Sequence, residues 1–544
     1  MPPSTAAAAA SWALPSLRVL ATYAAVALAA IVLYEIVRSR VKGWTVRRLR
    51  RSAEAFIRKH DIRVDRFKLS NEAYVKAELL NDRELHGDMV AYAEERNLLL
   101  EHVRADVEKY IEEIVPFFSY IAYYRLARPV ARFVLNMVYR VVVDHESIRI
   151  AQKKIPDDAV AVYMMNHRSN FDYVLAAHML IHEIALSYAV GEWARVWPLE
   201  SIFKSFGSYF IRRGFRDPLY HAVLRKYVQL ISLRGVTQGF FPEGRLTRDG
   251  AMKEPKVGLL DYIVTILSQE GFRSDVVLVP VGLNFDQVVE DQALVGEALR
   301  GKEAPPGVRE KILSLLRLVV LGPFTLAYNL GRVLLGGLKR HGYASASLGE
   351  PLSVRGWLAE RRAAGEDVLA LPPAERKARV AELAAQLMQR IGRAVPVTPV
   401  PLVATALLDA GAAGGPVARE TVVRRVRALS EIARQRGAPL LQGQEFSETA
   451  RQRGELDRAR DEGARRPELL DVEEHIVTHD EAATTAKLGL EILVRRGLVA
   501  STGRGEAQRL SVTGEMEPYV RYYANSIKQH FEAPAAAPVA VKAG

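Results

Sequence analysis

The chain of 544 residues contains no cysteine. A thiol nucleophile, a disulfide and a thiolate metal site are therefore excluded. The sequence also lacks a phosphate-cradling P-loop and the glycine fingerprint of a dinucleotide-binding fold, so nucleotide-dependent activation chemistry is not indicated. The chain is instead 49% hydrophobic and 25% charged. That composition supplies enough apolar material for roughly two to four domain cores.

Positive charge is in excess and is concentrated near the start of the chain. The net formal charge is +12, and the first 51 residues hold eight basic side chains against one acidic side chain. Most of this cluster, Arg38–Arg51, follows the uncharged apolar stretch Val19–Tyr34. A helix over that stretch would span about 24 Å, slightly less than a roughly 30 Å hydrocarbon core. We therefore expect a single-pass or interfacial membrane anchor that contacts membrane lipid and leaves the following chain on the cytoplasmic face, with an organelle-targeting segment as the alternative.

The most informative motif is His167 followed five positions later by Asp172. Residues five apart on a continuous helix diverge by about 140° around its axis, so these side chains meet only if a strand ends and a helix begins between them. The flanking patterns fit such a corner, because Ala159–Met165 is typical of a buried strand and Phe171–Leu180 of a helix. Asp172 would then hold the imidazole Nδ1–H and turn Nε2 toward a substrate hydroxyl. A surface histidine near a helix cap is the alternative interpretation.

Three later segments also place polar groups at the ends of apolar strands. Gly207–Arg213 ends in two adjacent arginines, of which only one can face a shared cleft because neighbours on a strand point to opposite faces. Gly239–Gly250 is an aromatic strand that breaks into a glycine-flanked charged loop. Val276–Phe285 is a continuous apolar run typical of a buried parallel strand. The sequence therefore predicts an α/β fold with a central, mostly parallel sheet flanked by helices.

The remaining chain is expected to be mostly helical. We predict an N-terminal membrane segment, a helical region, a catalytic domain, a mainly helical C-terminal region and a disordered tail, at 1–52, 53–145, 146–352, 353–532 and 533–544. A strand is expected at Tyr343–Leu348, and long helices at Pro373–Ala394 and Val417–Arg436. Glu491–Leu510 could form a helix followed by a small β-hairpin. The apolar tract Ile312–Leu338 either rests on a bilayer or covers the sheet.

Together these segments resemble the motif blocks of the glycerolipid acyltransferases, in the glycerol-3-phosphate and dihydroxyacetone-phosphate branch. The similar segments are Asn166–Tyr173 for the H-x4-D block and Gly207–Arg213, Phe241–Gly250 and Val279–Val281 for the second, third and fourth blocks. Two further stretches, Thr398–Leu408 and Val520–Ile527, resemble segments of the long glycerol-3-phosphate enzymes. The resemblance covers the chain from Ala159 to Phe531.

The resemblance implies acyl transfer from acyl-CoA or acyl carrier protein to the sn-1 hydroxyl of glycerol 3-phosphate, with no cofactor. His167 would be the general base, and Asp172 would orient it and stabilise the imidazolium. The implied substrate-binding residues are Arg168, Ser169, Arg213, Glu243, Gly244, Arg245 and Arg248, with Arg212 and Pro280 as further candidates. Arg213 and Arg248 are the first choices for the phosphate, because a guanidinium donates two parallel hydrogen bonds. Glu243 is expected to contact a hydroxyl or to position an arginine.

The third block departs from the family pattern. Arg245 follows Gly244 directly, one place earlier than the first arginine of the family, whereas Arg248 keeps its expected place. Such a variant also resembles enzymes that acylate lysophospholipids. Dihydroxyacetone phosphate and a lysophospholipid therefore remain alternative acceptors, and a catalytically inactive membrane scaffold is the non-enzyme alternative.

Other patterns do not predict further sites. His178 and His182 share a helical spacing with a nearby Glu183, but no third ligand is visible, so no metal site is predicted. His475 and His479 repeat the spacing in a charged region that is typical of a solvated face. The chain lacks a basic recognition helix and interleaved aromatics, so no nucleic-acid partner is predicted.

Overall fold

The computed structural model describes seven stretches of the chain, 72–117, 128–180, 186–195, 199–269, 271–300, 340–441 and 481–532. The expected anchor Val19–Tyr34, the tract Ile312–Leu338 and the tail 533–544 lie outside these residues. None of the helices in the described stretches combines the length and the apolar character that a bilayer crossing requires.

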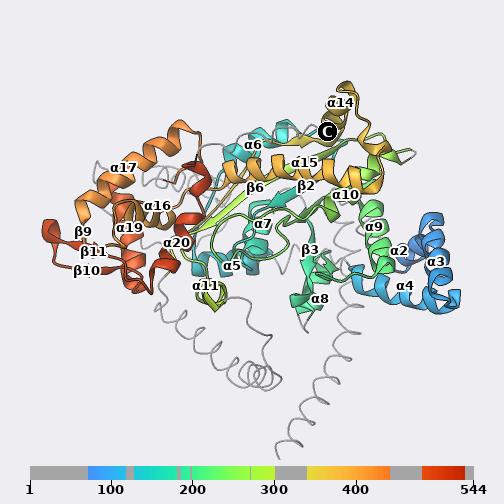
Figure 1. Cartoon of the computed structure of the whole chain (residues 1–544), viewed down its shortest axis with the longest axis horizontal. Coiled ribbons are helices and arrows are strands. Elements are labelled where there is room, and N and C mark those ends of the chain that lie inside the picture. Colours follow the sequence, from blue (N-terminus) through green and yellow to red (C-terminus); the bar gives the residue numbers. More distant parts are fainter. Residues whose placement is uncertain are drawn as a thin grey trace, which may run out of the picture.

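A central sheet of eight strands organises the described residues (Figure 1). In spatial order the strands are β1 (Arg140–Val143), β7 (Tyr343–Leu348), β6 (Val276–Phe285), β2 (Val160–Met165), β5 (Gln238–Phe240), β3 (Ser187–Gly191) and β4 (Tyr209–Ile211), and β8 (Leu352–Ser353) pairs with β6. The run from β6 to β4 is parallel throughout, whereas β7 and β8 are antiparallel to β6. The expected mostly parallel α/β sheet is confirmed.

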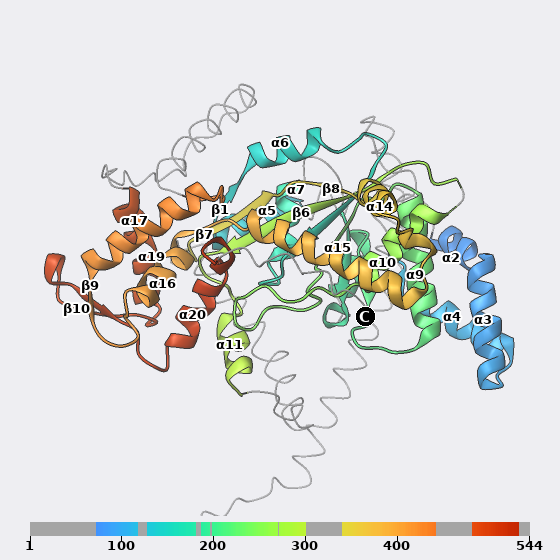
Figure 2. The ribbon, with the colours of Figure 1, turned by 45° about the horizontal axis from the view of Figure 1, so that its top comes forward.

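Both faces of the sheet are buried, as the apolar strand patterns require. All six residues of β2 are buried, and alternate side chains enter different layers because the strand period is two. One layer contains α9 (Pro218–Leu233), α10 (Gly258–Val264), α14 (Val354–Ala363) and α15 (Pro373–Ala394). The other layer contains α5 (Arg128–Val138), α6 (His145–Lys153), α7 (Asp172–Leu180), α8 (Leu199–Ser205) and α11 (Asp291–Arg300). Figure 2 shows α15 lying across the strands.

Several expected elements coincide with the observed bounds, and two differ. The strands over Val276–Phe285 and Tyr343–Leu348 and the helix over Pro373–Ala394 occur as expected. The sheet, however, begins with β1, inside the region 53–145 that was expected to be helical. The helix expected from Val417 begins at Arg419, because Val417 and Ala418 form β9 and pair with β11.

The N-terminal helices pack on the sheet layer through α9. They are α2 (Glu72–Leu80), α3 (Arg83–Arg96) and α4 (Leu100–Ile114), and they contribute Leu85, Val103 and Ile111 to a core shared with Tyr220. Ion pairs add to this packing, since Arg225 of α9 contacts Asp88 at 2.7 Å. Figure 1 shows these helices at the end of the molecule opposite the C-terminal elements.

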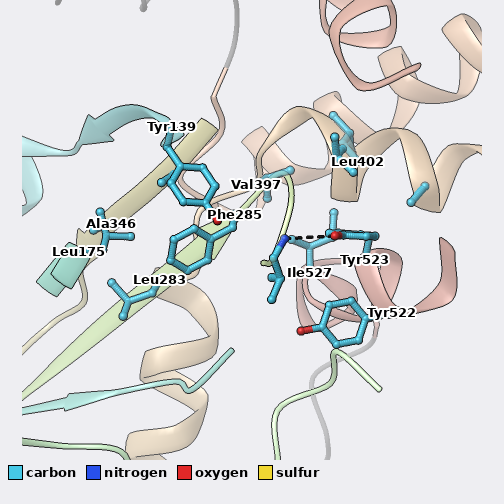
Figure 3. Close-up of a cluster of buried hydrophobic side chains, with 14 of the residues drawn as sticks. Tyr139, Leu175, Leu283, Phe285, Ala346, Val397, Leu402, Tyr522, Tyr523 and Ile527 are labelled. Carbon is cyan, nitrogen blue, oxygen red and sulfur yellow. Dashed lines mark hydrogen bonds between the residues drawn. The ribbon is translucent and has the colours of Figure 1, made fainter. Parts of the chain in front are cut away.

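The C-terminal elements form a helical unit with a small sheet. They are α16 (Pro399–Asp409), β9 (Val417–Ala418), α17 (Arg419–Gln435), α19 (Glu481–Arg495), β10 (Ala500–Thr502), β11 (Arg509–Ser511) and α20 (Glu517–Asn525). The hairpin expected after Glu491 is present as the antiparallel pair β10–β11. Helix α20 brings the buried pair Tyr522 and Tyr523 against the end of β6, where Phe285 lies (Figure 3).

A buried carboxylate joins this unit to the sheet. Asp286, directly after β6, accepts hydrogen bonds from the backbone N–H groups of Tyr343 at 2.8 Å and Val400 at 2.9 Å. Val400 lies in the first turn of α16, where the helix dipole favours a negative charge. Burial nevertheless raises the pKa of Asp286 to about 6.

A substitution at Gly250 tests the close approach of α20 to the loop that follows β5. Gly250 has a φ of +82°, and a Cβ atom there would lie 1.8 Å from the carbonyl oxygen of Tyr522. Gly250→Ala should therefore lower the free energy of unfolding by about 2–5 kcal/mol, through left-handed strain and overpacking against backbone. Chemical denaturation of the purified chain measures this.

Gly235→Ala is the matched control, because Gly235 has a φ of +73° but nothing within 4 Å of a built Cβ. This variant should lower the free energy of unfolding by about 1–2 kcal/mol, through backbone strain alone. Equal losses in the two variants would contradict the close approach of α20.

Candidate functional site

The structure brings His167 and Asp172 together at a strand-to-helix corner. β2 ends at Met165, and α7 begins at Asp172. The His167 Nδ1 atom lies 2.9 Å from Asp172 Oδ2, and both side chains are buried. Because the carboxylate accepts the Nδ1–H, the imidazole is held in the tautomer that leaves Nε2 unprotonated. Nε2 has no hydrogen-bond partner among the described residues, so it is the nitrogen that remains free to act as a base.

A single oxygen of Asp172 fixes the turn around it. Asp172 Oδ2 also accepts the backbone N–H groups of Arg168 at 2.6 Å and Ser169 at 2.9 Å. The carboxylate lies in the first turn of α7, where the helix dipole stabilises negative charge. Three N–H donors therefore converge on this one oxygen at the start of α7.

Two aromatic rings hold the plane of the imidazole. His167 stacks on Phe241 with ring centroids 4.0 Å apart and an interplanar angle of 21°. Tyr173 meets the imidazole edge-on at 5.7 Å. Phe241 follows β5, so the strand adjacent to β2 supplies the surface against which the imidazole packs. The ring is thereby fixed both by its hydrogen bond and by its packing.

The loop of the third block clamps the backbone of His167 from both sides. Glu243 Oε1 accepts the His167 N–H at 2.8 Å, and the Thr247 N–H donates to the His167 carbonyl at 3.1 Å. The second oxygen of Glu243 accepts the Lys253 N–H at 2.9 Å. The expectation that Glu243 would contact a hydroxyl or an arginine therefore differs from its observed partners, which are two backbone amides.

Glu243 carries a strongly shifted pKa. Burial raises the pKa of this carboxyl to about 7, against the opposing effect of the two N–H groups that it accepts. The group thus titrates near neutral pH, next to the histidine that it positions.

Arg168 and Ser169, which were expected to bind substrate, both turn to protein partners. Arg168 is 2% exposed, donates from Nη1 to Asn284 Oδ1, and lies 5.1 Å from the ring centre of Tyr522. The Ser169 hydroxyl donates to Glu290 Oε2 at 2.8 Å and accepts the Phe171 N–H at 3.1 Å. These two side chains support the turn, and neither opens to solvent.

The two arginines after β4 point in different directions, as expected for neighbours on a strand. Arg212 makes a two-point ion pair with Glu113 of α4 and packs among the rings of three aromatic residues, Tyr110, Phe215 and Tyr220. Arg213 is exposed and lies against Gly191, where a Cβ atom would come within 2.8 Å of its guanidinium. Gly191, which the sequence motifs do not include, therefore makes room for the exposed one of these two arginines.

The other candidates are distributed around the same loop. Arg245 is exposed, whereas Arg248 pairs with Glu297 of α11. Gly244 has a φ of +73°, which allows the loop to reverse directly after β5. Pro280 lies inside β6, paired with Met164, and is a strand residue rather than a member of the polar cluster.

The parallel strands bring the imidazole of His167 and the guanidinium of Arg213 to the same edge of the sheet. The strands β2, β5, β3 and β4 are consecutive neighbours. His167, Glu243 and Arg213 follow the carboxyl ends of β2, β5 and β4, and Gly191 is the last residue of β3. Strands lie about 4.8 Å apart, so Gly191 is roughly 10 Å across the edge from His167. That separation is on the scale of a small molecule that could contact both side chains at once.

No metal centre occurs in the described stretches of the chain. No group of three His, Asp or Glu side chains there is arranged to hold an ion. His182 and Glu183, and the pair His475 and His479, lie outside the described residues.

Two family models match separate parts of the chain. A family model described as acyltransferase matches residues 147–284, and one described as the glycerol-3-phosphate acyltransferase C-terminal region matches residues 329–459. A curated glycerol-3-phosphate acyltransferase from Aeromonas hydrophila subsp. hydrophila is 28% identical over 348 residues. That alignment covers 63% of this chain but 40% of the relative, so the chain matches less than half of the relative's length.

One similar solved structure is the crystal structure of the 1-acyl-sn-glycerophosphate (LPA) acyltransferase from Thermotoga maritima. It is 15% identical, with a TM-score of 0.27, and the match covers 49% of this chain and 77% of that chain.

The raised pKa of Glu243 predicts a pH-dependent stability difference. The folded carboxyl keeps its proton up to about pH 7, whereas the unfolded carboxyl releases it near pH 4.5. The stability that this group contributes is therefore present below pH 4.5 and is lost as the pH rises through 7. Relative to Glu243→Gln, the wild type should lose up to about 3 kcal/mol of unfolding free energy over this range.

Urea denaturation of both proteins at intervals between pH 5 and 8 measures the difference. A difference that does not change with pH would contradict the raised pKa. A difference that grows in favour of the wild type would mean that the two N–H groups outweigh burial.

Proposed function

We propose that the chain transfers an acyl group from a thioester to the sn-1 hydroxyl of glycerol 3-phosphate, a reaction supported by its similarity to the acyltransferase models and to a curated glycerol-3-phosphate acyltransferase. The product would be lysophosphatidate, the first intermediate of glycerophospholipid synthesis. The observation that carries the proposal is the buried His167–Asp172 pair, at a sheet edge that also holds the exposed Arg213.

The reaction needs one base and no covalent intermediate on the protein. Nε2 of His167 takes the proton of the acceptor hydroxyl as its oxygen attacks the thioester carbonyl. A C–O bond forms, the C–S bond breaks, and the departing thiolate receives the proton back from the imidazolium. Asp172 stabilises that imidazolium across the 2.9 Å contact, and the face of Phe241 adds a favourable quadrupole interaction.

The phosphate would be bound by guanidinium groups. Arg213 is the first choice because it is exposed and has no ion-pair partner within the described residues. Arg245 is likewise exposed, and Arg248 could join it by exchanging its surface pair with Glu297, which is weak because both side chains are solvated. Arg212 is not assigned to the phosphate, since Glu113 and three aromatic rings already hold it.

The donor would be acyl-CoA or acyl carrier protein. Both carriers are acidic, and the chain has a net charge of +12, which favours encounter with either. Membrane lipid would be a further partner, through the apolar stretch Val19–Tyr34 and the basic residues that follow it, with the catalytic domain on the cytoplasmic face.

Two other acceptors are alternatives, a lysophospholipid and dihydroxyacetone phosphate. Arg245 follows Gly244 directly, as in enzymes that acylate lysophospholipids, and dihydroxyacetone phosphate offers the same phosphate and a similar hydroxyl.

Purified full-length chain should be assayed with the three acceptors, each with acyl-CoA and with acyl carrier protein. The proposal requires the highest kcat/KM with glycerol 3-phosphate.

Removal of the His167 imidazole should greatly lower kcat while the chain remains folded. His167→Ala is expected to lower kcat by about 10²–10⁴-fold, the usual contribution of a general base. The exposed His102 of α4 offers a matched control, and His102→Ala should keep full activity. If His167→Ala retained the activity of the control, His167 would not be the base.

Removal of the proposed phosphate ligand should act on acceptor binding. Arg213→Ala is expected to lower kcat/KM for glycerol 3-phosphate by about 10–100-fold, mostly through KM, because a charge-assisted hydrogen bond is lost. Arg216→Ala, at another exposed arginine after β4, is the control and should behave as wild type. Arg212→Ala should instead lower the unfolding temperature, because it leaves Glu113 buried without this partner. An unchanged KM in Arg213→Ala would remove this residue from the phosphate site.

A further inference from the structure

Two adjacent carboxylates at the start of α11 contact different parts of the molecule. Glu290 precedes the helix and reaches the turn between His167 and Asp172, where Oε2 accepts the Ser169 hydroxyl at 2.8 Å and Oε1 accepts the Asn170 N–H at 3.2 Å. Neither contact involves the reacting groups themselves. Glu290 therefore contacts the turn between β2 and α7 at two points without touching His167 or Asp172.

The next residue, Asp291, is buried and faces the C-terminal elements. Arg496, directly after α19, donates to Asp291 Oδ2 at 2.6 Å, and the Tyr523 hydroxyl of α20 donates to the same oxygen. The Tyr523 oxygen in turn accepts Arg496 at 2.8 Å and the Val288 N–H at 3.1 Å, the dashed contact in Figure 3. Burial raises the pKa of Tyr523 well above its usual range, so the hydroxyl remains a donor at neutral pH.

Helix α20 also contacts the catalytic turn directly. The ring of Tyr522 lies 5.1 Å from the guanidinium carbon of Arg168, and its hydroxyl is 3.4 Å from the Arg168 carbonyl oxygen. Asn525 donates to the carbonyl of Asp249 in the third-block loop at 2.9 Å. The helix thus rests on the two segments that hold His167.

We propose that Glu290 is a positioning residue for the base and that α19 and α20 hold it in place through Asp291. This inference rests on the proposed acyl transfer. If Glu290 is removed, Ser169 and Asn170 lose their partner, and the N–H groups that Asp172 accepts from Arg168 and Ser169 shift with them. The imidazole then loses its fixed direction while the arginines of the acceptor site are untouched.

Positioning of this kind changes turnover more than binding. Glu290→Ala should lower kcat by about 10–100-fold, as expected for a misplacement of about 1 Å, while KM for glycerol 3-phosphate changes less than about twofold. Glu290→Gln keeps one acceptor and the side-chain length, so it should recover most of the lost kcat. Arg496→Gln should lower kcat by about 5–20-fold, although Arg496 contacts no residue of the base pair.

Arg495→Gln is the matched control for Arg496→Gln. Arg495 is the neighbouring arginine, but it is exposed, and its contact is the Arg340 carbonyl at 3.3 Å. This variant should keep the kcat of the wild type.

Amide hydrogen exchange of the turn supplies a readout that does not depend on catalysis. In the full-length protein, the backbone amides of 168–172 should exchange at least about tenfold faster in Glu290→Ala and Arg496→Gln than in the wild type or Arg495→Gln. A wild type inactive with every acceptor would refute the proposed function, and faster exchange at the turn would still support the positioning role. Unchanged exchange at the turn in Glu290→Ala would overturn the inference, even if kcat fell together with global stability.

Discussion

One carboxylate oxygen determines the geometry of the site. Asp172 Oδ2 accepts the imidazole Nδ1–H and two backbone N–H groups of the turn that carries the imidazole. The same atom therefore selects the histidine tautomer, shapes the loop between β2 and α7, and supplies the negative charge that a protonated ring requires. The backbone clamp of Glu243 and Thr247 and the ring of Phe241 act on a residue whose direction is already set by this contact.

Local patterns in the sequence were sufficient for the elements that the site uses. The apolar run Val276–Phe285 occurs as β6, as expected for a strand buried on both faces. Tyr343–Leu348, which alternates small residues between two larger apolar ends, occurs as β7. The start of the sheet at β1 was missed. Arg140–Val143 is short and follows an amphipathic helix, and it pairs with β7, about 200 residues later. No pattern within four residues can indicate a partner so distant.

The sequence predicted some of the contacts in the candidate site but not others. The approach of His167 to Asp172 followed from the spacing and the strand-to-helix corner. The role of Glu243 as an acceptor of backbone amides did not, because backbone groups have no sequence signature. Residue type also gave no indication that the side chains of Arg168 and Ser169 hydrogen-bond to Asn284 and Glu290. The space for Arg213 is made by Gly191, on a different strand, and only the register of β3 and β4 reveals it.

Helix α20 is synthesised long after the turn between β2 and α7 that it contacts. Tyr522 and Arg168 are 354 residues apart in sequence. At ribosomal rates of about 5–20 residues per second, the turn exists for roughly 20–70 s before its C-terminal support has been made. The contacts between Tyr522 and Arg168 can therefore form only when nearly the whole described chain has left the ribosome.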